Sequence, residues 1–224
     1  MENICKFRKR YKKNLISPKK ISIGSSLLTY ESAQKLHDIF PEAELYYTYG
    51  LTEMGPRVST QKINFTEMSG AIPIGKALDN VEFNLGKNLE VKSLYAAENL
   101  TEKFFDTKDA YENSEYGIKI KGRSDDTIIF QGRNIFPSEI EQVIKEIDAQ
   151  CEVAMVGLPS TVFGQVPVLV YIGQMTESEV LKNLAEKVPE SHMPRKFYKW
   201  DSLPKNHMGK IERAKIISIL EQDS

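Results

Sequence analysis

This sequence of 224 residues has little cysteine, no long hydrophobic run and no overall excess of either charge. Its two cysteines, Cys5 and Cys151, are too few for a disulfide scaffold, and their scarcity favours a reducing, cytoplasmic environment. No stretch approaches the roughly 18 consecutive apolar residues that indicate a membrane-spanning helix. The His and Cys residues nowhere show the spacing of a zinc site. We therefore expect neither a disulfide-rich domain nor a helical membrane protein nor a zinc module.

Basic residues are concentrated at the start of the chain. Residues 1–20 contain eight Lys and Arg against one acid, although the whole chain has 30 basic and 31 acidic residues. Such an arm can bind nucleic acid or acidic lipid. However, apolar residues recur in it at spacings of three and four, and aromatic rings do not alternate with the basic residues as base stacking requires. We therefore expect a helix with a solvated face, no nucleic-acid partner and, since no apolar segment follows, no signal peptide.

The first part of the chain has the pattern of an α/β layer. A composition of 41% hydrophobic and 27% charged residues suits a globular protein with a core. Apolar runs at 20–23 and 44–48 predict strands, and residues 30–40 between them predict a helix with one apolar face. The order strand–helix–strand predicts an α/β layer.

The middle of the chain alternates apolar and polar residues with period two, which is typical of half-buried strands. Segments 81–85 and 89–93 are separated by Gly-Lys-Asn, which is a hairpin signal, and residues 116–122 alternate as well. We therefore expect a small antiparallel β-subdomain at residues 70–124.

From residue 125 onward the pattern is that of a separate α+β module. A Pro at a first helical position and a Thr-x-x-Glu capping box mark helices, and apolar runs mark strands. The expected elements are a strand at 127–130, a helix from Pro137, strands at 153–158 and 166–173, a helix after Thr176, a loop at 194–209 and a helix from Arg213. The expected fold is α/β with α+β, with an incomplete α/β layer at 1–69, the β-subdomain at 70–124 and a small α+β domain at 125–224.

Residues 70–76, Gly-Ala-Ile-Pro-Ile-Gly-Lys, match the first seven positions of a phosphate-binding P-loop. The eighth position needs Ser or Thr to bind magnesium, but it is Ala77. The motif must also lie between a strand and a helix, whereas Pro73 interrupts it and a β-patterned segment follows. We therefore interpret this match as coincidental.

Three other segments carry residue types suited to nucleotide chemistry. Residues 49–53, Tyr-Gly-Leu-Thr-Glu, follow an expected strand, and they offer a sharp turn, a hydroxyl, a hard oxygen ligand for Mg²⁺ and a ring that can stack on a purine. An ordinary capping turn would explain the same five residues. Residues 122–141 gather more fixed charge around a strand than a plain strand requires. In the polar loop 203–213, a glycine precedes Lys210, and a mobile lysine can act as a point charge on phosphate.

Together and in this order, these segments resemble the adenylate-forming superfamily, which includes acyl- and aryl-CoA synthetases, peptide-synthetase adenylation domains and luciferases. The resemblance covers nearly the whole chain. It implies a small-residue loop beside adenine and the acyl group, a Tyr-Gly pair at the adenine, a Thr that contacts phosphate and a Glu that holds magnesium. In this sequence these residues are Gly24, Ser25, Ser26, Tyr49, Gly50, Thr52 and Glu53.

The resemblance also assigns roles in the rest of the chain. Residues 105–109, Phe-Asp-Thr-Lys-Asp, are similar to the family's Tyr-x-Thr-Gly-Asp, whose Asp binds the ribose hydroxyls, but Lys108 replaces the glycine. Gln131 replaces a glycine that many thioester-forming members carry. The implied roles are ribose contact for Asp109 and Arg123, hinge of a mobile C-terminal domain for Asp125, the thioester-step tunnel for Gly132 and catalytic lysine of adenylation for Lys210.

The resemblance implies an ATP-dependent, AMP-forming carboxylate ligase that works in two steps. A carboxylic acid attacks the α-phosphate of ATP to give an acyl-adenylate and pyrophosphate, while Lys210, Thr52 and Mg²⁺ held by Glu53 stabilise the developing charge. The C-terminal domain then swings about Asp125. The thiol of CoA, or of a phosphopantetheine carrier protein, finally attacks the acyl-adenylate.

Two parts of the family pattern are absent from these 224 residues: the Ser/Thr/Gly-rich phosphate loop and most of the acyl pocket. The chain therefore resembles the C-terminal half of such a ligase, and we expect it to be inactive or weakly active by itself. The alternative hypothesis is a catalytically incomplete remnant, or a subunit that binds and complements a separate N-terminal half.

Overall fold

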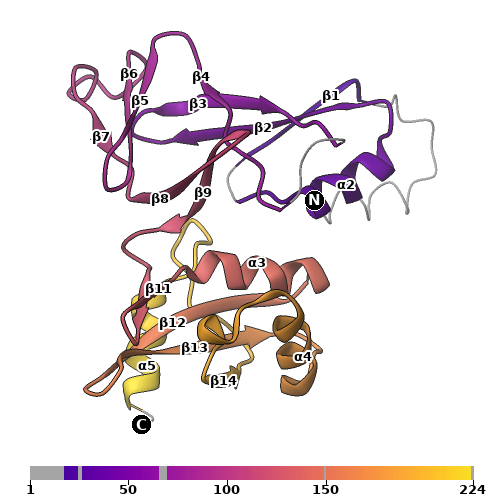
Figure 1. Cartoon of the computed structure of the whole chain (residues 1–224), viewed down its shortest axis with the longest axis vertical. Helices are drawn as coiled ribbons and strands as arrows, with labels where there is room; N and C mark the ends of the chain where they lie inside the picture. The colour runs from indigo at the N-terminus through magenta and orange to yellow at the C-terminus, as the bar shows by residue number, and fades with distance from the viewer. Residues whose placement is uncertain (1–17, 25–26, 66–69, 149, 223–224) are drawn as a thin grey trace. The chain divides into compact units, whose positions relative to one another are not determined.

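In a computed structural model the chain forms two compact units, residues 1–121 and 122–224 (Figure 1). The structure describes residues 18–24, 27–65, 70–148 and 150–222, so the basic helix expected at 1–20 lies almost wholly outside the described part. No helix in that part is long and apolar enough to cross a membrane. The division after Lys121 falls three residues before the boundary expected at 124.

The first unit contains the predicted strand–helix–strand arrangement. β1 (Lys20–Ile23) pairs in parallel with β2 (Glu44–Leu51), and α2 (Tyr30–Ile39) connects them. The hydroxyl of Thr29 accepts a hydrogen bond from the Ser32 amide at 3.3 Å and so caps the first turn of α2. Because the connected strands are parallel, both have their carboxyl ends at the same edge of the sheet.

Two antiparallel strands complete this sheet. β3 (Gly55–Lys62) pairs with β2, and β4 (Lys76–Ala77) pairs with β3, which gives the order β1-β2-β3-β4. Residues 70–76 therefore run into a strand and lack the helix that a P-loop needs after it. Residues 76–77 also belong to this sheet, although the sequence places them in the β-subdomain.

The expected small antiparallel sheets follow. β5 (Val81–Leu85) and β6 (Leu89–Ser93) form the predicted hairpin, and β7 (Phe105–Asp106) pairs with the far side of β6. β8 (Asp109–Ser114) and β9 (Gly117–Arg123) form a separate two-stranded sheet. The predicted mixture of an α/β layer and antiparallel sheets is thus confirmed for the first unit.

One buried cluster joins the first sheet, α2 and the hairpin. Leu36 of α2, Leu45 of β2 and Leu89 of β6 are each at most 2% exposed and all belong to it. Burial of a leucine side chain contributes about 1.5–3 kcal/mol. The carboxyl edge of β1 and β2 therefore rests on a packed core.

The second unit is built on a five-stranded sheet. Its main strands are β10 (Ile128–Phe130), β11 (Arg133–Ile135), β12 (Glu152–Ser160) and β13 (Gly164–Ile172), in the order β11-β10-β13-β12. β14 (Lys196–Lys199) pairs with β13 in parallel. The remaining pairs are antiparallel, which suits an α+β domain.

The helices of the second unit begin where the sequence predicts. α3 (Pro137–Ile147) has Pro at its first position, and α4 (Glu177–Lys187) begins after the predicted capping box of Thr176 and Glu179. α5 (Arg213–Gln222) ends the described chain. These starts are specified locally, by caps and by a fixed proline φ. A short 3-10 helix, Glu190–His192, precedes β14.

Alternate residues of β12 enter two separate cores. Val153 and Met155 pack with buried residues of α3 and α4, whereas Ala154 and Val156 pack with buried residues of α5. Successive side chains of a strand point to opposite faces of its sheet. α3 and α4 therefore cover one face and α5 covers the other (Figure 1). This double coverage explains why β12 reads as a continuous apolar run.

Several local expectations are wrong or incomplete, and no strand is expected where β3 lies. The loop expected at 194–209 contains β14, and the strand expected to end at Thr48 continues to Leu51. The short strand β11 is not predicted by the sequence at all. Each of these segments obtains its hydrogen bonds from a partner strand, namely β13, β3 and β10. A local pattern does not show such partners.

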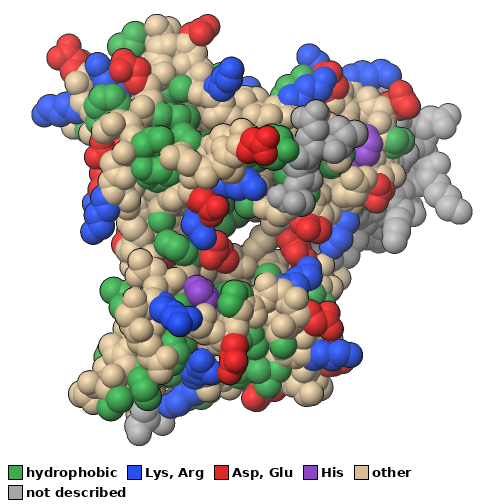
Figure 2. All heavy atoms as spheres, in the orientation of Figure 1, with side chains coloured by type: hydrophobic (Ala, Val, Ile, Leu, Met, Phe, Trp, Pro, Cys, Tyr) green, Lys and Arg blue, Asp and Glu red, His purple; other side chains and the backbone are tan. Residues whose placement is uncertain are grey.

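Charged side chains of both signs are mixed on the described surface. Figure 2 shows Lys and Arg side chains among Asp and Glu side chains over the visible face. Some of them form ion pairs between neighbouring elements, such as Lys62 with Glu44 and Lys205 with Glu152. Exposed pairs contribute at most about 1 kcal/mol each. These exposed pairs therefore contribute little to the stability of the fold.

Candidate functional site

The carboxyl ends of two neighbouring parallel strands form the centre of the candidate site. β1 is followed directly by Gly24, and β2 carries Tyr49 and Gly50 near its end. Ligands of α/β sheets bind at the carboxyl edge of the strands, next to the loops that leave it. The residues that the resemblance assigns to the nucleotide thus lie where such a sheet is suited to bind one.

The small-residue loop predicted after β1 is described in part. A Cβ on Gly24 would lie 2.8 Å from Oγ1 of Thr48, so only glycine fits beside that side chain without a shift. The Thr48 hydroxyl also donates a hydrogen bond to the Ile23 carbonyl at 3.1 Å and ties the two strands together. Ser25 and Ser26 lie outside the described residues, and their role stays a prediction.

Gly50 is required by a close approach of two strands. A Cβ at this position would lie 2.2 Å from the carbonyl oxygen of Pro56 in β3. The pairing of β2 with β3 is irregular at the same place, which is typical of a β-bulge. Beyond the bulge, Thr52 and Glu53 are exposed in the turn that leads to β3. Their hydroxyl and carboxylate are therefore accessible to a ligand at this edge.

Tyr49 and Asp109, 60 residues apart in the sequence, meet in the structure. The Tyr49 hydroxyl donates a hydrogen bond to Oδ2 of Asp109, a buried residue at the start of β8. Burial and the negative charge of Asp109 raise the pKa of Tyr49 well above its ordinary range, so Tyr49 keeps the proton that it donates. Burial and the same carboxylate raise the pKa of Tyr47, also on β2, to about 12. Two residues assigned separately to adenine and ribose are thus in direct contact.

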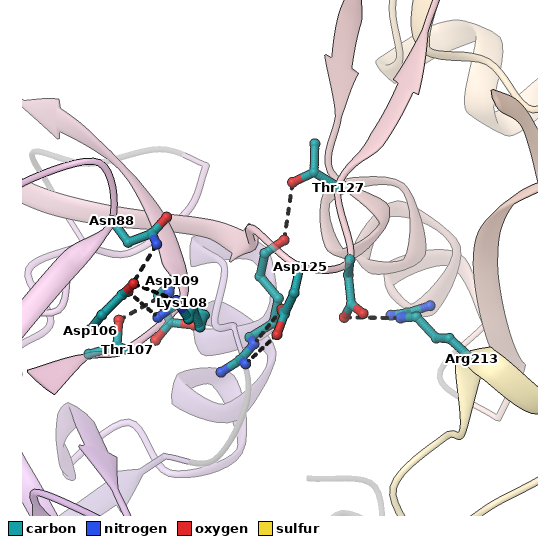
Figure 3. A network of polar contacts seen from close by, with 10 residues as sticks. Asn88, Asp106, Thr107, Lys108, Asp109, Asp125, Thr127 and Arg213 are labelled. Carbon is teal, nitrogen blue, oxygen red and sulfur yellow. Dashed lines mark hydrogen bonds and ion pairs between the residues drawn. The ribbon is translucent and has the colours of Figure 1, made fainter. Parts of the chain in front are cut away.

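The backbone of Asp109 is held by Thr107. The Asp109 amide donates to Oγ1 of Thr107 at 3.0 Å (Figure 3). The Thr107 hydroxyl donates to the Leu89 carbonyl of β6 at 2.7 Å. Thr107 is 2% exposed, so water does not compete for these bonds. A carboxylate on a backbone fixed in this way is preorganised for a ligand.

In the second unit the structure brings Arg123 and Asp125 together. Nε and Nη2 of Arg123 donate to the two carboxylate oxygens of Asp125 at 3.0 and 2.7 Å. The Thr127 hydroxyl donates to the Arg123 carbonyl at 3.2 Å (Figure 3). A two-point contact of this kind fixes the plane of a guanidinium. The predicted ribose contact and the predicted hinge residue therefore form an ion pair, which the sequence does not predict.

Gln131 and Gly132 form the two-residue turn between β10 and β11. Phe130 pairs with Arg133 across the turn, and the turn residues have positive φ angles of 52° and 75°. Positive φ at both positions is typical of a type I′ hairpin turn, for which glycine and asparagine are favoured. Gln131 thus adopts a conformation that side chains disfavour. The backbone alone explains Gly132, and its role in a thioester tunnel stays a prediction.

Lys210 lies on an exposed loop that Asn206 closes. Oδ1 of Asn206 accepts hydrogen bonds from the amides of Met208 at 2.9 Å and Lys210 at 3.0 Å. The Asn206 amide donates to the Lys210 carbonyl at 2.8 Å, and Lys205 pairs with Ile211 at the base of the loop. The backbone of Lys210 is therefore fixed on both sides, while its exposed side chain can carry its charge to a ligand.

An ion-pair network that the sequence does not predict follows this loop. Arg213, at the start of α5, donates to both carboxylate oxygens of Glu141 at 2.6 and 3.1 Å and to the Met155 carbonyl at 3.0 Å. Its Nε lies 3.1 Å from a carboxylate oxygen of Asp126 (Figure 3). Burial opposes the charge of Arg213, but the two carboxylates outweigh burial and raise its pKa. This network joins α3, β12 and α5.

The donor set at the carboxyl edge fits magnesium bound together with a nucleotide. Within the described part of the chain, no group of three or more His, Cys, Asp or Glu side chains could hold a metal ion by itself. Mg²⁺ commonly binds through one or two carboxylates together with substrate phosphates and waters. The exposed carboxylate of Glu53 suits that mode of binding.

Comparison with known proteins relates the chain to CoA ligases. Residues 139–210, from α3 to the Lys210 loop, match the family model of the AMP-binding enzyme C-terminal domain. A 2-succinylbenzoate–CoA ligase of Bacillus cytotoxicus is 28% identical over 205 residues, which cover 80% of this chain and 42% of the relative. The chain thus spans less than half the length of that relative.

Solved structures share the fold of the chain. The o-succinylbenzoate CoA synthetase of Bacillus subtilis, in complex with its acyl-adenylate intermediate, matches with a TM-score of 0.81 and 19% identity over 95% of this chain and 49% of that chain. The same synthetase in complex with ATP and magnesium matches with a TM-score of 0.81 and 20% identity over 96% of this chain and 50% of that chain. The predicted fold class is therefore confirmed.

Proposed function

Because the chain belongs to the adenylate-forming superfamily, we propose that it supplies the adenosine-binding edge and the catalytic lysine of an AMP-forming carboxylate–CoA ligase. The observation that carries this proposal is the hydrogen bond from Tyr49 to the buried carboxylate of Asp109. It joins a purine-stacking ring and a ribose-binding carboxylate at the carboxyl edge of a parallel strand pair. The names of the relatives, which are CoA ligases, support the same reaction class.

The adenosine part of the nucleotide engages the first unit. The ring of Tyr49, oriented by its bond to Asp109, stacks on adenine beside Gly24. A carboxylate accepts up to about four hydrogen bonds, so the bond from Tyr49 is compatible with bonds from the ribose hydroxyls to Asp109. Arg123 is a further candidate for a ribose contact.

In the first step, a carboxylate oxygen of the acid substrate forms a bond to the α-phosphorus of ATP, and the bond from that phosphorus to pyrophosphate breaks. Negative charge develops on the phosphoryl oxygens, so a preorganised cation lowers the barrier. Lys210 supplies this charge, and the Thr52 hydroxyl donates to a phosphate oxygen. Glu53 would hold Mg²⁺, which would neutralise further charge on the phosphates.

In the second step, the thiol of CoA forms a bond to the acyl carbon, AMP leaves and the thiol proton passes to solvent. A rotation about Asp125 removes Lys210 and presents the Gly132 turn to the pantetheine arm. A carrier-bound phosphopantetheine has the same thiol, but the relatives favour CoA as the acceptor.

The proposal requires a phosphate loop that these 224 residues do not contain. Adenylation depends on a positioned triphosphate, because correct orientation supplies much of the rate enhancement. The loop would come from a longer form of the chain or from a separate N-terminal half. We therefore expect no pyrophosphate exchange from the 224 residues alone.

Nucleotide binding by the purified chain tests the proposal. We expect the chain to bind AMP in isothermal titration calorimetry, and Asp109→Asn to weaken this binding about tenfold or more, because hydrogen bonds to a charged group contribute roughly 1.5–3 kcal/mol. Asp79→Asn changes an exposed carboxylate of the same unit and should leave the affinity unchanged. A chain that does not bind AMP, or an Asp109→Asn variant with wild-type affinity, would contradict the proposal.

The proposed hinge predicts a protease-sensitive segment. Limited proteolysis should cut near residues 122–126 and release a stable fragment of about 100 residues, because linkers between compact units are exposed and cleaved first. The side chains of Arg123 and Asp125 are 45% and 55% exposed, which suits such a cut. Mass spectrometry would locate the cleavage. Resistance at 122–126 with cleavage elsewhere would argue against a hinge at Asp125.

A further inference from the structure

The turn that carries Asp109 contains a backbone conformation that its sequence disfavours. Lys108, between β7 and β8, has a φ of 62°, in the left-handed region. Side chains with a Cβ are strained there, and glycine is not. The chain nevertheless places a lysine directly before Asp109, so something else must hold the turn in this shape.

Asp106 makes the contacts that hold Lys108 in this conformation. Oδ1 of Asp106 accepts a hydrogen bond from the Lys108 amide at 2.9 Å, and Oδ2 accepts one from Nζ of Lys108 at 2.6 Å (Figure 3). The Asn88 side chain donates to Oδ1 at 2.9 Å from the neighbouring hairpin turn. The bonds from the side chain and the amide of Lys108 lower the pKa of Asp106 to about 2, so the carboxylate is charged at neutral pH.

The regular sheet gives this turn little support. β7 has two residues, and its pairing with β6 ends at Asp106. β8 begins only at Asp109. Between them, Thr107 is bonded to Leu89 of β6 through its amide and its hydroxyl, and that hydroxyl also accepts the bond from the Asp109 amide, but Lys108 has no strand partner among the described residues. The direction in which Asp109 leaves the turn therefore depends on the conformation of Lys108.

We propose that Asp106 is a positioning residue for the ribose-binding carboxylate of Asp109, because it clamps Lys108 in the left-handed conformation that the turn needs. The inference rests on the proposed function. A glycine would adopt this conformation without help, whereas in this chain the hydrogen bonds from Lys108 to Asp106 hold it. The side chains of Asp106 and Lys108 are 37% and 52% accessible, so their ion pair is exposed and contributes little. The hydrogen bond from the Lys108 amide to Asp106 is therefore the larger part of the clamp.

The test compares the affinity of AMP with that of 2′,3′-dideoxy-AMP, which lacks the ribose hydroxyls. Their ratio reports the ribose contact and does not change when a variant is merely less stable. The wild-type chain should prefer AMP by about tenfold or more. Asp106→Ala should reduce the preference to about threefold or less, because Lys108 is then released. Asp106→Asn keeps an oxygen acceptor for the Lys108 amide and should retain most of the preference.

Rescue by glycine makes the test specific. Lys108→Gly alone should behave as wild type, and the double variant Asp106→Ala with Lys108→Gly should regain most of the preference, because glycine adopts this φ without a clamp. Asp79→Asn, which changes an exposed carboxylate of the same unit, is the control and should keep the wild-type preference. An Asp106→Ala variant with the wild-type ratio, or a double variant without recovery, would overturn the role of Asp106.

A second measurement separates this inference from the proposed function. A wild-type chain with no preference for AMP would overturn ribose binding by Asp109, and with it the proposed function. In that case, hydrogen exchange at the Asp109 amide, measured without nucleotide, still shows whether the turn keeps its conformation. It should accelerate about tenfold or more in Asp106→Ala and recover in the double variant, and an unchanged rate would show that Asp106 does not hold the turn.

Discussion

Replacing Lys210 with alanine is expected to slow adenylate formation about a hundred- to a thousandfold. The loss of one preorganised charge beside a developing negative charge costs about 3–4 kcal/mol of transition-state stabilisation. Folding should change by no more than about 0.5 kcal/mol, because the position is exposed and Asn206 holds the loop through backbone groups that alanine retains.

The measurement follows both half-reactions in a complex of this chain with a polypeptide that carries the phosphate loop. Pyrophosphate exchange reports adenylation, and thioester formation from supplied acyl-adenylate reports the second step, in which Lys210 takes no part. Lys182→Ala, which removes an exposed lysine of α4, should leave both rates unchanged. Equal losses in both half-reactions would contradict the hinge mechanism. No loss in either would favour a non-catalytic subunit.

The elements that the sequence predicts are those with local signals. The capping box of Thr176 and Glu179 and the Gly-Lys-Asn turn between β5 and β6 involve residues close together in the chain. β14 differs, because its four residues form a strand only through their pairing with β13. The extension of β2 to Leu51 depends in the same way on β3. Long-range hydrogen bonds of this kind leave no periodic pattern in the sequence.

The same difference between local signals and long-range contacts applies to the candidate site. Short motifs point to Tyr49 and Lys210, and a resemblance points to Asp109, but no pattern places Tyr49 against Asp109. Glu141 shows the difference most clearly. Nothing in its helical segment, Ser-Glu-Ile-Glu, marks it as buried, yet it is 6% exposed. The reason is Arg213, 72 residues later in the chain, whose guanidinium compensates the buried charge.

Removing the charge of Arg213 is expected to destabilise the second unit by about 3–5 kcal/mol. Arg213→Met keeps an apolar stem but leaves the carboxylate of Glu141 buried, with the Met155 amide at 2.9 Å as a remaining donor. A buried charge without its partner costs this much because neither water nor a counter-ion replaces the lost contacts. The Glu141 side chain is 8% exposed, so its carboxylate is a buried charge of this kind. Urea unfolding followed by the fluorescence of Trp200, the one tryptophan of the chain, reports this unit directly.

Two further variants separate the buried charge from the loss of packing. Glu141→Gln combined with Arg213→Met removes both charges and keeps an acceptor for the Met155 amide, so the double variant should recover about half of the loss or more. Lys215→Ala breaks the exposed pair between Lys215 of the same helix and Glu212, the residue before that helix, and should cost no more than about 0.5 kcal/mol. If Arg213→Met costs as little as Lys215→Ala, the network does not hold α3, β12 and α5 together. If the double variant is no more stable than Arg213→Met, packing and not the unpaired charge accounts for the effect.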